Sequence, residues 1–253
     1  MPVRIQTADF DSGREIAALC AGDPRVGAVA SFIGVVRDLN DGDRVSTLFL
    51  EHYPGMTERE VAWELESFMR THGASAVSFE LIVGSGPNGA LPHLHPTGRA
   101  IQAGEPVVMD LGCVVDGYCS DVTRTVCLGE PKDSRYMELW NLVLKANETA
   151  RTGVKAGVTG VEGDKLGRDV IAEAGYGNYF GHGLGHGVGL AIHEGPRFSF
   201  AYPDRVPVGA VMTIEPGVYL PGWGGIRIED MVLVREGGVE VLTGAPKVAI
   251  LDR

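Results

Sequence analysis

Several features of other protein classes are missing from this 253-residue chain. No apolar run approaches the roughly 18 residues of a membrane span, and the N-terminus lacks a secretory signal pattern. The four cysteines, Cys20, Cys113, Cys119 and Cys127, form no CxxC pair, and three of them lie close together in the sequence. We therefore expect reduced core thiols in a cytoplasmic protein.

Positive charge is also scarce. The chain has 22 Lys and Arg against 33 Asp and Glu, for a net charge of −11 at pH 7. This balance disfavours non-specific binding to nucleic acid or to an anionic membrane. There is no internal repeat and no low-complexity linker, and the hydrophobic content of 44% is ordinary for a globular protein. The length leaves room for one large domain or two modest ones.

Five side chains stand in short motifs that suit metal ligands. They are Asp110 in VVMDLGC, Asp121 in YCSDVTRT, His186 in GHGLGHGVG, Glu215 in MTIEPGVY and Glu229 in IRIEDMV. Carboxylates with one imidazole suit hard or borderline divalent ions. Four carboxylate charges also balance two divalent cations and leave room for a bridging hydroxide. The set therefore predicts the site of a hydrolase.

The two aspartates can be placed by hairpin geometry. Asp116-Gly117 between apolar runs is a strong signal for a two-residue turn. If the flanking residues face each other, Asp110 lies opposite Thr123, and Asp110 and Asp121 are diagonal neighbours on one face, roughly 7–8 Å apart. The alternative is a pair of acids on a surface hairpin. We disfavour it because Asp110 ends the apolar run PVVM, and a buried acid needs a partner or a metal.

Residues from about 54 to 253 resemble the catalytic domain of the pita-bread metallopeptidases, close to aminopeptidase P and prolidase. All five ligand positions of the family's motif are filled, and HGLGHGVGLAIHE resembles the prolidase form. The resemblance implies an α/β (α+β) fold, a curved antiparallel sheet with helices packed outside. It also implies a dinuclear peptidase that removes the amino-terminal residue from peptides or dipeptides, with proline after the scissile bond.

The resemblance implies a role for each ligand. Asp110, Asp121, His186, Glu215 and Glu229 would hold two divalent metal ions, with Glu215 as the general base that takes a proton from the bridging water. The carboxylate-rich set favours manganese, and cobalt, iron and zinc are the alternatives.

Further residues surround these ligands in the resemblance. His93, in GSGPNGALPH, and His193 would stabilise the oxyanion or position the substrate, and His182 would line the same cleft. Arg227 would hydrogen-bond a ligand carboxylate, and Tyr219 is a second candidate on the substrate side.

Two patterns imitate other sites. His182 and His186 have the spacing of a helical zinc motif, but the alternating glycines disfavour a helix, and Gly183 stands where the acid belongs. The segment GSGPNG at 84–89 fits the dinucleotide fingerprint, but the ALPH that follows does not open a helix. We take His95 as a structural residue.

The first fifth of the chain has a different likeness. Residues 1–53, through MPVRIQTADF and VGAVASFIGVVRDLNDG, resemble the N-terminal part of the molybdopterin synthase large subunit. Only Arg37 matches a position tied to substrate phosphate, and the family's later basic segment has no counterpart. We therefore expect a composite chain. An incomplete α/β segment replaces the usual first helix, and the peptidase domain, 54–253, opens with Thr57 as the N-cap of a helix over 58–71.

Periodicity predicts the other elements of the peptidase domain. Helices are expected over 134–151 and 161–174. Strands over 212–219 and 226–234, joined by the turn PGWGG, would carry the two site glutamates to the centre.

Two alternatives to the peptidase stay open. One is a non-catalytic binding module on the same fold, although such proteins lose ligands and none is lost here. The other is a molybdenum-cofactor biosynthesis protein with a small sulfur-carrier partner, against which the missing basic segment argues. A homodimer is a further expectation, because the apolar face left by the missing helix would favour pairing with another chain.

Overall fold

The computed structural model describes residues 55–251. The molybdopterin-synthase-like segment, with Arg37 and the expected boundary at 54, lies outside these residues. Within the described part, no helix is long and apolar enough to cross a membrane.

Helices and strands alternate irregularly along the described residues. The helices are α2 (Glu58–Thr71), α3 (Arg135–Gly153) and α4 (Gly160–Glu173), with the 3-10 helices η1 (Gly86–Ala90) and η2 (Gly177–Tyr179). The strands are β1 (Ala76–Val77), β2 (Ile82–Ser85), β3 (Pro106–Leu111), β4 (Cys113–Val115), β5 (Tyr118–Cys119), β6 (Val122–Leu128), β7 (Gly185–Gly187), β8 (Glu194–Phe198), β9 (Val211–Ile214), β10 (Gly217–Leu220), β11 (Gly224–Arg227), β12 (Asp230–Arg235), β13 (Gly238–Val241) and β14 (Ile250–Leu251).

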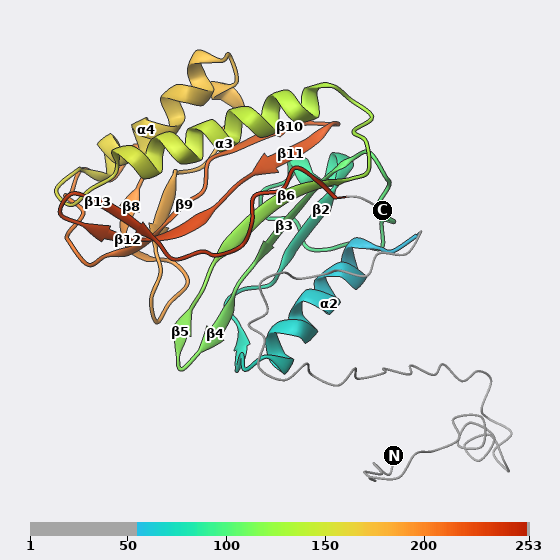
Figure 1. Ribbon diagram of the computed structural model, residues 1–253, viewed down its shortest axis with the longest axis horizontal. Helices are drawn as coiled ribbons and strands as arrows, with labels where there is room; N and C mark the ends of the chain where they lie inside the picture. Colours follow the sequence, from blue (N-terminus) through green and yellow to red (C-terminus); the bar gives the residue numbers. More distant parts are fainter. Residues whose placement is uncertain (1–54, 252–253) are drawn as a thin grey trace, which may run out of the picture. The chain divides into compact units, whose positions relative to one another are not determined.

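The strands form two larger and two smaller sheets. The five-stranded sheet has the order β13-β12-β9-β7-β8, and the four-stranded sheet has the order β14-β6-β3-β2. All of their pairings are antiparallel except β14 with β6. Helices α3 and α4 lie together over one side of the strands, and α2 lies beside β2 (Figure 1). The domain is therefore mixed α/β, with mainly antiparallel pairing.

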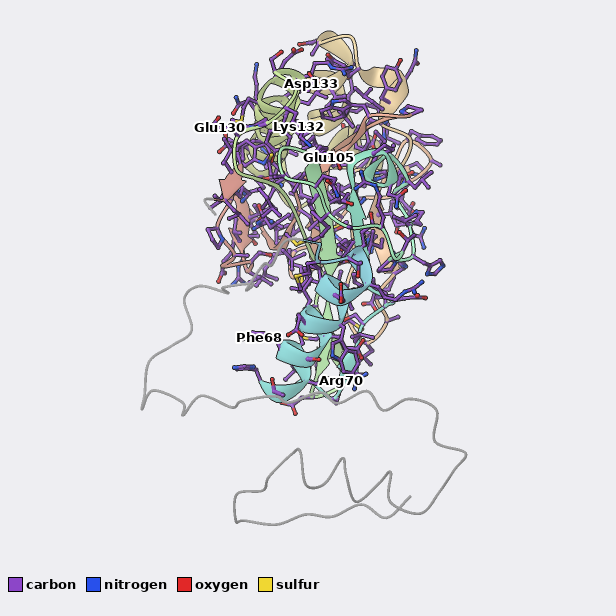
Figure 2. The ribbon with its side chains drawn as sticks, turned by 90° about the vertical axis from the view of Figure 1, so that its right-hand side faces the viewer. Phe68, Arg70, Glu105, Glu130, Lys132 and Asp133 are labelled. Carbon is purple, nitrogen blue, oxygen red and sulfur yellow. The ribbon has the colours of Figure 1, made fainter. Side chains whose placement is uncertain are left out.

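The described domain has two apolar cores. The larger lies under α3 and α4 and includes Leu139, Val143 and Ile214, each 0% exposed. The smaller packs α2, through Val61 and Leu65, against strands of the four-stranded sheet. Figure 2 shows α2 from the side, with Phe68 and Arg70 at its C-terminal end.

The predicted helices are confirmed to within two residues. Helix α2 spans Glu58–Thr71 as expected, and Thr57 caps it in a reciprocal capping box with Glu60. Helices α3 and α4 begin and end close to the predicted bounds.

The hairpin prediction is also confirmed. Val115 pairs with Tyr118 on either side of the turn, and Asp110 pairs with Thr123. Asp116, at φ 51°, and the glycine after it, at φ 84°, adopt the left-handed conformations of a type I′ turn.

The prediction of two unbroken strands over 212–219 and 226–234 is wrong. The first divides into β9 and β10, and the second into β11 and β12. Strand β9 pairs with β12, whereas β10 pairs with β11 in a separate sheet. Pro216 lies in the first break and has no N–H to donate to a ladder. Each break contains one of the two site glutamates, Glu215 or Glu229.

The glycine-rich segment at 84–89 opens no helix over the ALPH that follows, as predicted; the segment itself contains a short 3-10 helix, η1, which ends at Ala90. Its glycines allow three backbone segments to approach closely. A Cβ on Gly225 would lie 2.0 Å from the carbonyl oxygen of Gly89, and a Cβ on Gly84 would lie 3.1 Å from Gly89 Cα. Tight packing of η1 between β2 and β11 therefore accounts for these glycines.

We predict that Gly225→Ala destabilises the domain by about 1–3 kcal/mol, because the added methyl group meets backbone that cannot rotate away. The measurement is the free energy of unfolding in denaturant. Gly237→Ala is the control, since no atom lies within 4 Å of a Cβ placed there. Equal stability of the two variants would contradict the packing argument.

Candidate metal centre

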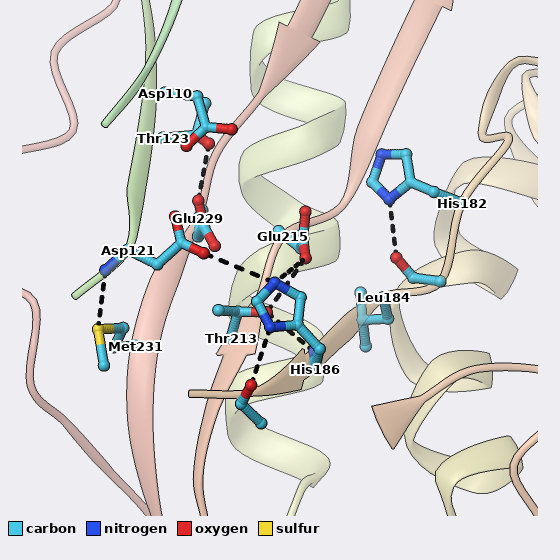
Figure 3. A network of polar contacts seen from close by, with 12 residues as sticks. Asp110, Asp121, Thr123, His182, Leu184, His186, Thr213, Glu215, Glu229 and Met231 are labelled. Atoms are coloured by element: carbon cyan, nitrogen blue, oxygen red, sulfur yellow. Dashed lines mark hydrogen bonds and ion pairs between the residues drawn. The ribbon is translucent and has the colours of Figure 1, made fainter. Parts of the chain in front are cut away.

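The five predicted ligand side chains line one cavity. Ligand atoms of Asp121, His186 and Glu229 all lie within 4.8 Å of one another. The Nε2 atom of His186 is 3.5 Å from Asp121 Oδ2 and 3.3 Å from Glu215 Oε1. Figure 3 shows these side chains converging from different elements, with Asp110 beside them.

Each ligand is positioned by the strand that carries it or by a strand break. Asp110 lies on β3, Asp121 directly precedes β6, and His186 lies at the centre of β7. The backbone N–H of Glu215 donates to Leu184 O at 2.8 Å, outside the β9 ladder. The N–H of Glu229 donates to the backbone of β6, at Thr123 O, at 3.1 Å. The breaks thus turn both glutamates toward the hairpin aspartates.

Hydroxyl groups and one guanidinium orient the carboxylates. Thr123 Oγ1 donates to Glu229 Oε2 at 2.7 Å, and Thr213 Oγ1 donates to Glu215 Oε1 at 3.1 Å. Arg227, which is 3% exposed, donates from Nη2 to Asp110 Oδ2 at 2.6 Å. Each of these bonds engages one of the two oxygens of its carboxylate.

The donor set fits cations on two independent grounds. Asp110 Oδ1 is buried and has no hydrogen-bond partner within the described domain. His186 Nδ1 lies 3.1 Å from Gly187 O, so this nitrogen carries the proton and Nε2 presents its lone pair. That lone pair faces the carboxylates of Asp121 and Glu215, an arrangement that repels unless positive charge lies between them.

The electrostatics of the site lead to the same conclusion. Burial, reinforced by the neighbouring carboxylates, raises the pKa of Asp121 to about 11. Burial likewise raises the pKa of Glu215 to about 8, against the lowering effect of Arg227, and raises the pKa of Glu229 well above its ordinary value. One guanidinium cannot balance four clustered carboxylates. Without added cations, the site therefore holds protons.

The three predicted histidines have different surroundings. His182 has both ring nitrogens engaged: Nδ1 lies 2.8 Å from Gly183 O, and Nε2 lies 2.8 Å from Tyr219 Oη. Burial lowers the pKa of His182 to about 3. Arg227 Nη1 donates to Tyr219 Oη at 2.8 Å, so the tyrosine hydroxyl donates onward to His182.

His93 and His193 are less engaged than His182. The ring of His193 meets the ring of His186 edge-on, with centroids 4.3 Å apart. His93 lies in the loop between η1 and β3, and both residues line the cavity. Their imidazoles are placed to contact a bound molecule.

Sequence reasoning missed several residues that the fold brings to the cavity. Phe79, Ile192 and Glu80 line it, and so does His95, for which the sequence predicts a structural role. His95 Nδ1 lies 2.9 Å from Glu80 Oε1, and both side chains are more than half exposed. The hydroxyl of Thr213 was also missed, although its position two residues before Glu215 on a strand is a readable signal.

We predict that the metal-free protein loses stability as the pH rises from about 7 to 8. In this range the native state keeps carboxyl protons that the unfolded chain has lost, because the folded pKa values are raised. The free energy of unfolding should fall by about 1.4 kcal/mol per pH unit for each such proton.

Chelated protein unfolded in denaturant at several pH values provides the measurement. Saturating Mn²⁺ should abolish the decrease in the free energy of unfolding with pH. Glu215→Gln should make the decrease smaller by the contribution of one titrating proton. A free energy of unfolding that rises over this range would contradict the assignment.

The chain is similar in sequence to known metallopeptidases, in agreement with the cluster of possible metal ligands. The sequence model of metallopeptidase family M24 matches residues 42–236. The chain is 46% identical over 189 residues to the Xaa-Pro dipeptidase of Pyrococcus furiosus, covering 75% of this chain and 54% of that protein.

Solved structures are similar over the same part of the chain. The Xaa-Pro dipeptidase from Bacillus anthracis superposes with a TM-score of 0.77 at 49% identity, covering 78% of this chain and 56% of that one. The X-Pro aminopeptidase from Thermotoga maritima gives a TM-score of 0.77 at 45% identity, and the match covers 80% of this chain and 57% of that one.

These likenesses define the fold and the family. The chain spans about half the length of the curated relatives it matches, 56% and 54% for two of them. The family match begins at residue 42, ahead of the boundary expected at 54, and does not reach the residues before it. The neighbours support the mixed α/β pita-bread fold for the described domain. The chain belongs to metallopeptidase family M24.

Proposed function

We propose that residues 54–253 form a catalytic domain that hydrolyses the amino-terminal bond of Xaa-Pro dipeptides or short peptides. The observation that carries this proposal is the convergence of four carboxylates, two buried and two partly buried, and one imidazole lone pair in a single cavity. Membership of M24 implies divalent metal ions, and the similarity to two Xaa-Pro dipeptidases suggests the Xaa-Pro class of substrate.

Two cations fit the ligand set, which consists of Asp110, Asp121, His186, Glu215 and Glu229. Bound there, they would balance the carboxylate charge and make a water molecule acidic near neutral pH, and oxygen-rich ligation favours manganese. Glu215 takes a proton from the attacking water and delivers it to the leaving amine. Thr213 holds one oxygen of this carboxylate by its hydroxyl.

The histidines divide into two roles in this proposal. His93 and His193 offer imidazole N–H groups to the oxyanion that develops on the scissile carbonyl. His182 has no free ring nitrogen, so it holds Tyr219, and through it Arg227, in the orientation that supports Asp110.

The cavity is suited to a small peptide with an apolar ring and a free carboxylate. Its volume is about 580 Å³, and Phe79, Ile82 and Leu94 supply apolar walls. Arg197 also lines it, on the strand opposite His186. The structure gives this guanidinium no ion-pair partner within the described domain, so its charge is available to a substrate carboxylate.

The first test is metal content and Xaa-Pro hydrolysis on one purified sample, with and without added Mn²⁺. We expect about two metals per chain with turnover, and loss of both in Asp121→Ala. Asp116→Asn is the control, because Asp116 is exposed at the hairpin turn and Asn tolerates its backbone conformation. A folded chain that binds no metal would overturn the proposal.

A second test addresses substrate length. Arg197→Gln should raise KM on the order of tenfold for an Xaa-Pro dipeptide, because a charge-assisted contact is lost. It should raise KM much less for the same dipeptide with an amidated C-terminus. Equal effects on the two substrates would remove Arg197 from carboxylate recognition.

A further inference from the structure

We infer that Glu58 is a positioning residue that fixes both ends of the loop carrying His93 above the cavity. The predicted effect of Glu58 on catalysis rests on the proposed function. The anchoring of the loop by Glu58 is independent of that function. Glu58 does not line the cavity, so it acts through the loop and not on the substrate.

The contacts of Glu58 join two segments that are distant from α2 in the sequence. Its carboxylate is 0% exposed at the first residue of α2. Oε1 accepts from Ser85 N and Ser85 Oγ, each at 2.8 Å. Oε2 accepts from Thr97 N at 3.1 Å and Thr97 Oγ1 at 2.5 Å, and Asn88 Nδ2 reaches both oxygens. Ser85 precedes the loop and Thr97 follows it.

Glu58 is held by neutral donors and not by a cation. The nearby Arg99 donates to Ser85 Oγ at 2.6 Å and to Glu105 at 2.6 Å instead. Burial by itself would raise the pKa of Glu58, but the bonds from Thr97, Ser85 and Asn88 bring it below its ordinary value. A buried carboxylate with this many donors ties them together more strongly than a neutral side chain would.

The loop between these anchors has little internal support. Between residues 91 and 96, the backbone bonds found in the described structure are Leu94 N to Leu91 O at 3.2 Å and Leu91 N to Asn88 O at 3.1 Å. Arg227 Nη1 also donates to Pro92 O at 3.4 Å. Pro92, His93, Leu94 and His95 nevertheless line the cavity. The position of His93 therefore depends on where the ends of the loop are held.

Capping of α2 does not account for Glu58. Thr57 and Glu60 already complete the capping box, with Glu60 Oε2 accepting from Thr57 N at 2.8 Å. An acid that served only the helix terminus would not need to be buried, because an exposed acid already stabilises a helix start. Complete burial against Ser85 and Thr97 points to the loop as the reason for the charge.

The test compares Glu58→Gln with Glu64→Gln in the full chain loaded with Mn²⁺. Glu64 lies on the same helix and is exposed, and its side chain has no ion pair or hydrogen bond in the described structure. Hydrogen exchange of the peptide covering 86–97 should rise at least about tenfold in Glu58→Gln only. Exchange in β3 and β6 and the metal content should not change.

Kinetics then separate positioning from general destabilisation. Glu58→Gln should lower kcat/KM for an Xaa-Pro dipeptide on the order of tenfold. In a His93→Ala background the same change should lower it less than about twofold, because the loop no longer presents the imidazole. An equal loss in both backgrounds would overturn the inference.

A second variant covers the case in which Glu58→Gln does not fold. Thr97→Val removes one donor to Glu58 and keeps the backbone N–H, so it should change exchange and kcat/KM in the same directions by smaller factors. Wild-type protein that exchanges normally but does not hydrolyse Xaa-Pro substrates would overturn the proposed function alone. Unchanged exchange of 86–97 in both variants would overturn the anchoring, whatever the activity.

Discussion

The site is organised around the mutual repulsion of four carboxylates that line one cavity, two of them buried and two partly buried. Asp121 and Glu229 are almost fully buried, and Arg227 is the guanidinium that contacts this cluster, through Asp110. The pKa values of Asp121 and Glu215 rise because burial removes water from their charged forms, and neighbouring carboxylates add to the rise. The fold thus holds a charge arrangement that is stable only with protons or with cations, which is the arrangement that a metallopeptidase requires.

Holding that arrangement determines the irregular parts of the sheets. A continuous strand directs neighbouring side chains to opposite faces, so it cannot freely aim a single carboxylate at a chosen point. Glu215 and Glu229 are not bound by this alternation of side-chain direction, because each lies in a break between two strands. His186 lies on β7 beside a register shift before Gly187, which is a third local departure from regular pairing.

The two sides of the cavity are held by different means. On the side of the clustered carboxylates, strands and threonine hydroxyls fix the side chains, as Thr123 does for Glu229. On the side of His93, a loop with few bonds of its own spans the gap between two anchored ends. In our inference, the buried charge of Glu58 gives that loop the precision that strands give the ligands.

The helices and the aspartate hairpin could be predicted from the sequence, because they follow from local rules: periodicity, capping and the turn at Asp116. The proposed ligands could be picked out because each stands in a short motif that resembles the family's. The positions of the strand breaks, and the contacts between residues far apart in the sequence, became apparent from the tertiary structure. From the sequence, Glu58 is expected only to stabilise the start of a helix, and His95 is expected to have only a structural role. Their partners Ser85, Thr97 and Glu80 are brought to them by packing across strands and loops, which no local pattern encodes.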